Sequence, residues 1–263
     1  MKIRQIRNAT VLLDFGTQKI LIDPMLSKKG SLPSLKWVTT NRRKNPIVDL
    51  PPETDDVLAS VTHVLITHCQ KGHFDHLDRA AIKWIRNKRI PVYCSADDSN
   101  FLKGLGLDVQ VLKVEASNPF LGGEISLVPC QHGIGFVGSL MAHGYGYMIK
   151  LPNHPSVYII GDSILTTIVK DAIQEFRPEI VVMAGGGAQF DLGGEIIMSA
   201  EDVLPMLKLV SGTLIVNHLE ALDHCPVTRE EVKRIGQDHG TGRLLVPGDG
   251  EEMELYRNPE PKT

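Results

Sequence analysis

The stretch THCQKGHFDHLD, residues 67–78, places three histidines and two aspartates within twelve positions. The apolar run at 61–67 before it predicts a buried strand, and the apolar spacing at 77–89 after it predicts a helix. Imidazole and carboxylate groups are the usual protein ligands of zinc and related divalent ions. The stretch therefore predicts a metal site between a strand and a helix.

Other apolar segments of the chain also end in a carboxylate or an imidazole. These strand-end residues are Asp23, His68, His132, Asp162, His218 and Asp249. If the strands share sheets, the side chains converge at one edge, where ligand sites of α/β proteins form. Ordinary loop polarity explains Asp23 and Asp249 equally well, but it explains the histidines and Asp162 poorly.

The order of the segments predicts the fold class. Strands are predicted at 10–14, 19–23, 61–67, 91–95, 108–114, 124–131, 145–150, 156–161, 179–185, 213–217 and 243–247, and helices at 77–89, 166–176, 199–210 and 228–237. Several strands follow one another too closely for crossover helices. A mixed α/β layered architecture is therefore expected rather than a purely parallel sheet.

Residues 25–60 lack this periodicity and predict an irregular, lid-like excursion. Folded over the metal site, it would offer polar side chains to a phosphate or carboxylate of a substrate, namely Asn41, Arg42, Arg43 and Asn45. A solvated basic loop is the alternative.

Composition narrows the function. A net charge of −3 and 5% aromatic residues argue against nucleic-acid binding. No apolar run is long enough for a bilayer, and MKIRQIRNAT lacks the apolar stretch of a signal peptide, so a cytoplasmic protein without membrane contact is expected. Four cysteines in 263 residues are expected to be reduced thiols. Oligomeric state stays open, with a homo-oligomer allowed.

The metal-site stretch resembles the metallo-β-lactamase superfamily, whose signature is His-x-His-x-Asp-His after a strand. Further similar motifs follow in the family's order: QHG at 131–133, GDS at 161–163 and NHLEALDHC at 217–225. The opening strands are similar to those of the branch that includes ascorbate-6-phosphate lactonase. The resemblance implies a single domain over 1–263, built as a four-layer αββα sandwich of mixed β-sheets with outer helices.

The resemblance also implies which residues hold metal. The first ion would be held by His68, His73 and His132, the second by Asp75, His76 and His218, and Asp162 would bridge them. Two divalent ions are expected, with Zn²⁺ favoured and Mn²⁺ or Fe²⁺ as alternatives.

One departure concerns the spacing of the first two histidines. His73 follows His68 by five positions where the family has two, so three residues are inserted. Lys71 stands two before His73 and cannot ligate while charged. We expect a bulged loop from which His68 still reaches the metal. A single-metal site, or ligation by the thiol of Cys69, is the alternative.

The function implied is hydrolysis of a small ester, lactone or phosphodiester by a metal-bound hydroxide. Asp75 and Asp162 would orient the water and move its proton, and His224 or Glu220 would polarise the substrate or protonate the leaving group. A non-catalytic or single-metal member that binds a ligand or partner is the alternative. A nuclease of the superfamily is disfavoured by the acidic balance and the few aromatic residues.

Overall fold

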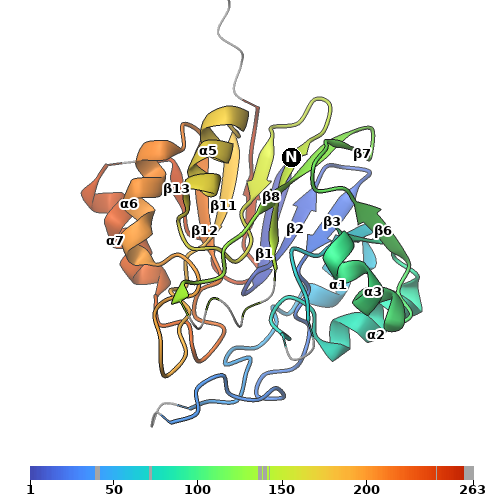
Figure 1. The fold of residues 1–263 in the computed structure, drawn as a ribbon, viewed down its shortest axis with the longest axis horizontal. Helices are drawn as coiled ribbons and strands as arrows, with labels where there is room; N and C mark the ends of the chain where they lie inside the picture. Colours follow the sequence, from blue (N-terminus) through green and yellow to red (C-terminus); the bar gives the residue numbers. More distant parts are fainter. Residues whose placement is uncertain are drawn as a thin grey trace, which may run out of the picture.

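Two seven-stranded β-sheets face each other, and helices cover the outer side of each (Figure 1). The computed structural model describes residues 1–38, 42–70, 73–135, 138, 141, 143–240 and 242–257. This arrangement confirms the predicted αββα sandwich of mixed sheets.

The first sheet has the strand order β14-β1-β2-β3-β4-β5-β6. Its strands are β1 (Lys2–Arg7), β2 (Thr10–Asp14), β3 (Lys19–Ile22), β4 (His63–Leu65), β5 (Val92–Ser95), β6 (Val109–Leu112) and β14 (Glu252–Glu254). Pairing is antiparallel from β14 to β3 and parallel from β3 to β6.

The second sheet repeats this pattern with the order β13-β12-β11-β10-β9-β8-β7. Its strands are β7 (Asn118–Phe120), β8 (Gly123–Pro129), β9 (Tyr145–Lys150), β10 (Val157–Ile159), β11 (Ile180–Ala184), β12 (Thr213–Asn217) and β13 (Leu244–Leu245). Pairing is antiparallel from β7 to β10 and parallel from β10 to β13.

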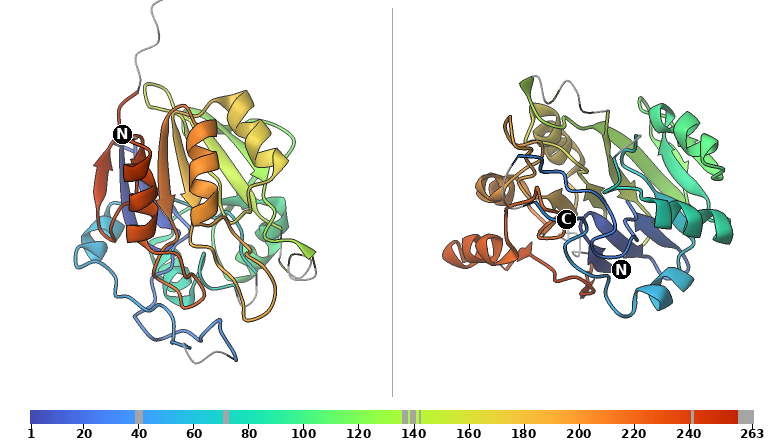
Figure 2. Two further views of the ribbon diagram at one scale, coloured as in Figure 1. Left: turned by 90° about the vertical axis from the view of Figure 1, so that its left-hand side faces the viewer. Right: turned by 90° about the horizontal axis from the view of Figure 1, so that it is seen from below.

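Helices flank the two sheets on opposite sides (Figures 1 and 2). Beside the first sheet lie α1 (Thr54–Ala59), α2 (Arg79–Lys88) and α3 (Ala96–Gly104); beside the second lie α5 (Thr167–Phe176), α6 (Ala200–Leu209) and α7 (Arg229–Asp238). Side-chain caps start two of these helices, because Thr166 accepts from Val169 N and Thr228 from Glu231 N.

The apolar core has three layers that follow from this stacking. Ile20, Ile125 and Tyr147 are fully buried in the cluster between the sheets. Separate clusters fill the space between each sheet and its helices. The sandwich therefore holds the ends of β3, β4, β8, β10 and β12 in fixed relative positions, which is what a site built from strand ends requires.

The excursion after β3 differs from the prediction at its end. The predicted irregular span 25–60 contains helix α1, so the irregular part stops before Thr54. We name residues 25–53 the lid segment. Figures 1 and 2 show it, in blue, crossing the end of the sandwich from which β3 leaves. In the described part of the chain, no helix has the length and apolar character needed to cross a membrane.

Candidate metal centre

The predicted ligands come together at one end of the sandwich. Two overlapping sets have ligand atoms within 4.8 Å of one another: His68, His73, His132 and Asp162, and then His73, Asp75, His76 and Asp162. The ligand atoms of His73 and Asp162 belong to both sets. Nearly all of these side chains are buried, so the fold shields an unusually polar cluster from solvent.

Asp162, which follows β10, lies at the middle of the cluster. Its Oδ2 is 3.1 Å from His76 Nε2, 3.5 Å from His132 Nε2 and 3.7 Å from His218 Nε2. His218 Nε2 is also 3.8 Å from Asp75 Oδ2. The structure therefore brings His218 beside the second set, as the strand-end pattern predicted.

The imidazoles point their Nε2 atoms inward because hydrogen bonds hold their Nδ1 atoms outward. His76 Nδ1 donates to Asp23 Oδ2 at 2.9 Å, and His132 Nδ1 donates to the carbonyl oxygen of Ile196 at 2.8 Å. Such bonds fix the tautomer that leaves Nε2 free for a metal. His218 Nδ1 lies 3.5 Å from the thiol of Cys225.

Asp23 belongs to the site, although the strand-end pattern gave it a plain loop role. Its carboxylate accepts from His76 Nδ1, from Thr67 N at 2.8 Å and from Thr67 Oγ1 at 2.6 Å. Thr67 Oγ1 in turn lies 3.0 Å from His68 Nδ1. The one sequence signal was its position directly after an apolar strand segment.

Two of these residues adopt strained backbone conformations. Asp23 has φ +45° and His218 has φ +60°, in the left-handed region that non-glycine residues seldom adopt. Gly161, just before Asp162, has φ +75°. Such strain costs about 1 kcal/mol or more per residue and is typical of functional sites.

The insertion before His73 leaves His68 in the cluster. His68 Nε2 lies 3.0 Å from His73 Nε2. Cys69 turns away, since both its backbone N–H, at 3.0 Å, and its thiol, at 3.5 Å, contact Asp98 Oδ1. The geometry favours His68 over Cys69 as a ligand. Lys71 lies outside the described residues.

Electrostatics within the cluster favour ionised carboxylates. Burial disfavours charge on Asp162, but His76 and His218 outweigh it and hold the pKa of Asp162 well below its usual range. Burial opposes charge on His76 as well, yet Asp162 and Asp23 raise the pKa of His76 well above its usual value. Burial lowers the pKa of His132 to about 4.

Several buried ligand atoms fit a metal. Among the described residues, no hydrogen-bond partner is found for His132 Nε2 or Asp162 Oδ1, and His76 Nε2 faces the Asp162 carboxylate at 3.1 Å. An unsatisfied buried polar atom is costly, so native proteins rarely keep one without an ion or water beside it. Nitrogen and oxygen donors in this number suit zinc, manganese or iron.

The accessory candidates have different surroundings. His224 is buried beside the centre, its ring stacked on Phe190 with centroids 5.9 Å apart. Burial opposes charge on His224, but Cys225 and Asp75 raise its pKa. Glu220 is instead held by Arg229, whose Nη1 lies 2.7 Å away. The geometry thus leaves His224 as the accessory group at the centre.

The predicted anion-binding residues of the lid segment are only partly available. Asn45 is buried, and its side chain bonds to the Pro33 carbonyl and to Asp223, which corrects its predicted role as a free ligand. Arg42 and Arg43 are exposed and line a pocket. Asn41 lies outside the described residues.

An apolar wall adjoins the centre. Phe74, Met141 and Phe190 pack, partly exposed, against a buried cluster that includes Met25 and Leu222. Phe74 lies between His73 and Asp75 in the sequence, and Phe190 stacks on His224. The surface beside the ligands therefore suits a small molecule with an apolar group.

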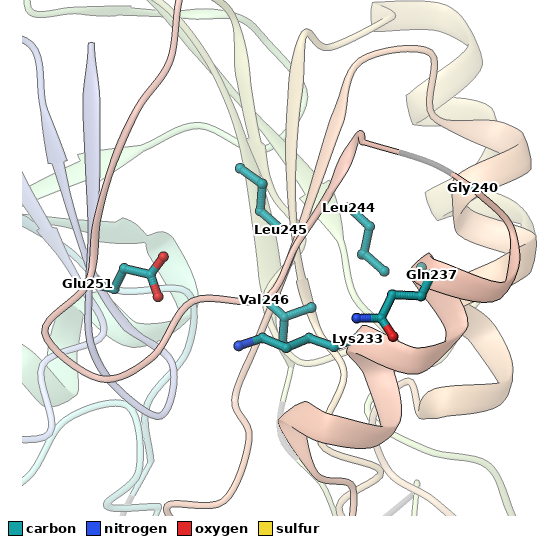
Figure 3. A pocket seen from close by; sticks show the side chains of 8 residues that line it. Lys233, Gln237, Gly240, Leu244, Leu245, Val246 and Glu251 are labelled. Atoms are coloured by element: carbon teal, nitrogen blue, oxygen red, sulfur yellow. The ribbon is translucent and has the colours of Figure 1, made fainter.

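Two pockets of the molecule differ in position. One of about 820 Å³ lies between the lid segment and the loop after β12, and its lining includes Cys225. Another, of about 400 Å³, lies between α7 and β13 (Figure 3). Lys233, Gln237 and Leu244 line the second pocket, and none of the candidate ligands lines either pocket.

Sequence comparison identifies the class of protein that this centre defines. The family model described as "Beta-lactamase superfamily domain" matches residues 18–218, and the chain belongs to that family. The predicted superfamily is thereby confirmed. The narrower likeness to the ascorbate-6-phosphate lactonase branch stays a prediction.

Individual relatives agree with this class. "UPF0173 protein YddR" of Bacillus subtilis (strain 168) is 34% identical over 257 residues, which is 95% of this chain and 98% of the relative. The structure of an isothiocyanate hydrolase from Delia radicum gut bacteria matches with a TM-score of 0.87 and 34% identity, covering 97% of this chain and 99% of that one. A possible metal-dependent hydrolase from Veillonella parvula DSM 2008 matches with a TM-score of 0.88 and 29% identity, with the same coverage. The predicted class, a metal-dependent hydrolase, is confirmed.

Proposed function

We propose that this chain holds two divalent metal ions and uses them to hydrolyse a small molecule with an apolar group. The convergence of two ligand sets that share Asp162 and His73 carries the proposal. His68 and His132 complete the first set, and Asp75 and His76 complete the second. His218 joins the second set from the end of β12. Zn²⁺ is the favoured ion for so many imidazoles, with Mn²⁺ or Fe²⁺ as alternatives.

When bound, such ions lower the pKa of water and stabilise negative charge that develops on the substrate. The chain's own groups complete the chemistry. Asp75 and Asp162, held ionised in the cluster, orient the attacking water and accept its proton. His224, buried and with a raised pKa, donates a proton to the leaving group.

The substrate we propose is an isothiocyanate. Support comes from the isothiocyanate hydrolase that is similar over 97% of this chain, and from the apolar wall of Phe74, Met141 and Phe190. Water would add its oxygen to the central carbon of R–N=C=S, and the C–N bond would then break. The nitrogen takes both protons, so the products are the amine R–NH₂ and carbonyl sulfide.

Small esters and lactones are the second candidate, because they also present an electrophilic carbon to the same apolar wall. A phosphodiester fits this wall less well, since its charged group would meet aromatic and thioether side chains. The sequence-based expectations of one domain over 1–263, a cytoplasmic location, a homo-oligomer and no nucleic-acid partner remain part of the proposal.

An activity panel tests the substrate. Purified protein would be assayed with an aryl isothiocyanate, a lactone, a carboxylic ester and a phosphodiester. We expect release of amine from the isothiocyanate, and its loss in His76→Ala and Asp162→Ala. Turnover of the lactone or the ester alone would contradict the proposed isothiocyanate substrate but would still support a hydrolase. No turnover of any compound, together with one bound ion or none, would favour the ligand-binding alternative.

A further inference from the structure

The carboxylate of Asp223, in the loop after β12, accepts several hydrogen bonds from the lid segment. Its Oδ1 accepts from Leu35 N at 3.1 Å and from Asn45 Nδ2 at 2.9 Å. Its Oδ2 accepts from the Ser34 hydroxyl and from Arg43 N at 3.4 Å. Because residues 34–35 and 43–45 lie in the first and second halves of the lid segment, this carboxylate ties both halves together.

Two further anchors hold the same segment. Asp191 Oδ2, from the loop after β11, accepts from the backbone N–H groups of Trp37 and Val38 near the tip. At the base, Arg7 donates to the carbonyl oxygens of Met25 and Ser27, both at 2.8 Å. Of these three anchors, Asp223 is the one that adjoins His224 in the sequence.

Asp223 lies directly before His224 and two residues before Cys225. The loop around it is held on both sides, since Ile47 N donates to Ala221 O at 2.9 Å and Gln189 N donates to His224 O at 3.0 Å. The position of the lid segment is therefore coupled to the backbone that carries His224.

The pocket of about 820 Å³ lies at this junction. Lys36, Arg42 and Arg43 line it from the lid segment, and Asp223 and Cys225 line it from the loop. One wall thus consists of a segment whose described residues form no helix or strand apart from an isolated bridge between Leu32 and Asn45, and its place depends on hydrogen bonds to a carboxylate. Hydrogen bonds to an ionised acceptor are roughly twice as strong as neutral ones.

We propose that Asp223 is a positioning residue that holds the lid segment against the loop of His224, as one wall of the pocket at this junction. The inference rests on the proposed function for the use of this pocket by the substrate, because the pocket is lined by Asp223 and Cys225 on either side of His224 and by none of the metal ligands. Asp223 belongs to neither ligand set, so its removal leaves the metal ligands in place and weakens the binding of substrate.

Limited trypsin digestion of the full-length, metal-loaded protein tests the anchor without any assay of activity. The part of the lid segment between its contacts to Asp223, residues 34–45, contains the trypsin sites Lys36, Arg42, Arg43 and Lys44. We expect cleavage there, mapped by mass spectrometry, to accelerate about tenfold in Asp223→Ala, because local opening exposes the backbone to protease. Asp223→Asn keeps one acceptor oxygen, so its cleavage rate should lie between those of the wild type and Asp223→Ala. Asp171→Asn, on an exposed position of α5, is the matched control and should cleave like the wild type.

Steady-state kinetics on the best substrate of the panel then separate positioning from plain stability. We expect KM to rise about tenfold in Asp223→Ala with kcat within about threefold, and a partial recovery of KM in Asp223→Asn. Metal content should equal that of the wild type. Unchanged trypsin cleavage would overturn the proposal, as would a fall in kcat at constant KM. If the wild type itself lacks metal or activity, the proposed function fails, while the digestion still decides whether Asp223 anchors the lid segment.

Discussion

Asp23 shows how one residue outside the ligand sets can control the metal centre. Its carboxylate orients His76 and receives two hydrogen bonds from Thr67. Removal of such a partner typically weakens metal binding by about 10- to 100-fold. We therefore expect Asp23→Ala to lose zinc affinity by that factor in a chelator competition assay.

Asp14→Ala is the matched control for this variant. Asp14 ends β2 at the opposite end of the same sheet and pairs with Lys19. Its removal should leave zinc affinity unchanged. Equal affinity in the wild type and Asp23→Ala would contradict the role given to Asp23.

His132 predicts a pH dependence for the metal-free protein. Burial lowers the pKa of His132 from 6.5 to about 4. Between these two pH values His132 is therefore protonated in the unfolded chain but neutral in the folded chain. Stability is therefore lost as the pH falls from about 6.5 to 4, by up to about 3 kcal/mol from this group. His132→Gln removes that contribution.

The measurement is urea unfolding of chelator-treated protein at pH 7.5, 5.5 and 4.5. The advantage of the wild type over His132→Gln should shrink as the pH falls. His239→Gln, at an exposed histidine after α7, should run parallel to the wild type. A constant difference between wild type and His132→Gln at all three values would refute the burial argument.

At the residue scale, the sequence predicted which side chains converge at the strand ends, but it did not predict that Asp23 hydrogen-bonds to His76. His73, Asp75 and His76 lie within four positions, so their chemistry is visible locally. The bond from His76 to Asp23 joins residues 53 positions apart and depends on the parallel register of β3 and β4. No local pattern encodes that register.

At the scale of elements, helix α2 couples the metal centre to the lid segment. Asp78 caps its first turn, accepting from Ala81 N at 2.8 Å, and its other oxygen accepts from Ser27 N at 2.6 Å. Loss of the cap and of this second bond should cost about 2 kcal/mol of unfolding free energy in Asp78→Ala.

Asp78→Ser keeps a capping oxygen and loses the bond to the lid segment. It should therefore recover about half of the stability lost in Asp78→Ala, again judged by urea unfolding. If the two variants were equally unstable, the cap would contribute nothing and the helix would depend on packing alone.

Some elements were not predicted because their residues lack a clear apolar periodicity. β1, KIRQIR, has two apolar residues three positions apart and so lacks the alternation of a strand, and it pairs with β14 some 250 positions away. α3 has weak amphipathicity because its buried residues include Asp98 and Ser99. Asp98 is buried because it accepts a hydrogen bond from Cys69 N in the loop that contains the insertion. Helix α2 and helix α5, with clear apolar stripes and capping residues, were predicted correctly.

At the scale of the whole molecule, the mixed sandwich explains why a distributed set of ligands can converge. Each sheet has three antiparallel and three parallel pairings. The layered class followed from the spacing of segments, and the four-layer order followed from the resemblance. The path of the lid segment could not be predicted from the sequence, because it depends on contacts to Asp191 and Asp223, which lie in loops distant in the chain.

The central claim is that this cluster holds two metal ions through a shared Asp162. Elemental analysis of protein purified without added metal tests it most directly. The wild type should carry about two divalent ions per chain, and Asp162→Ala should carry about one or fewer because both ligand sets lose a member. A wild type with one ion or none, or an Asp162→Ala protein with the same metal content as the wild type, would contradict the claim.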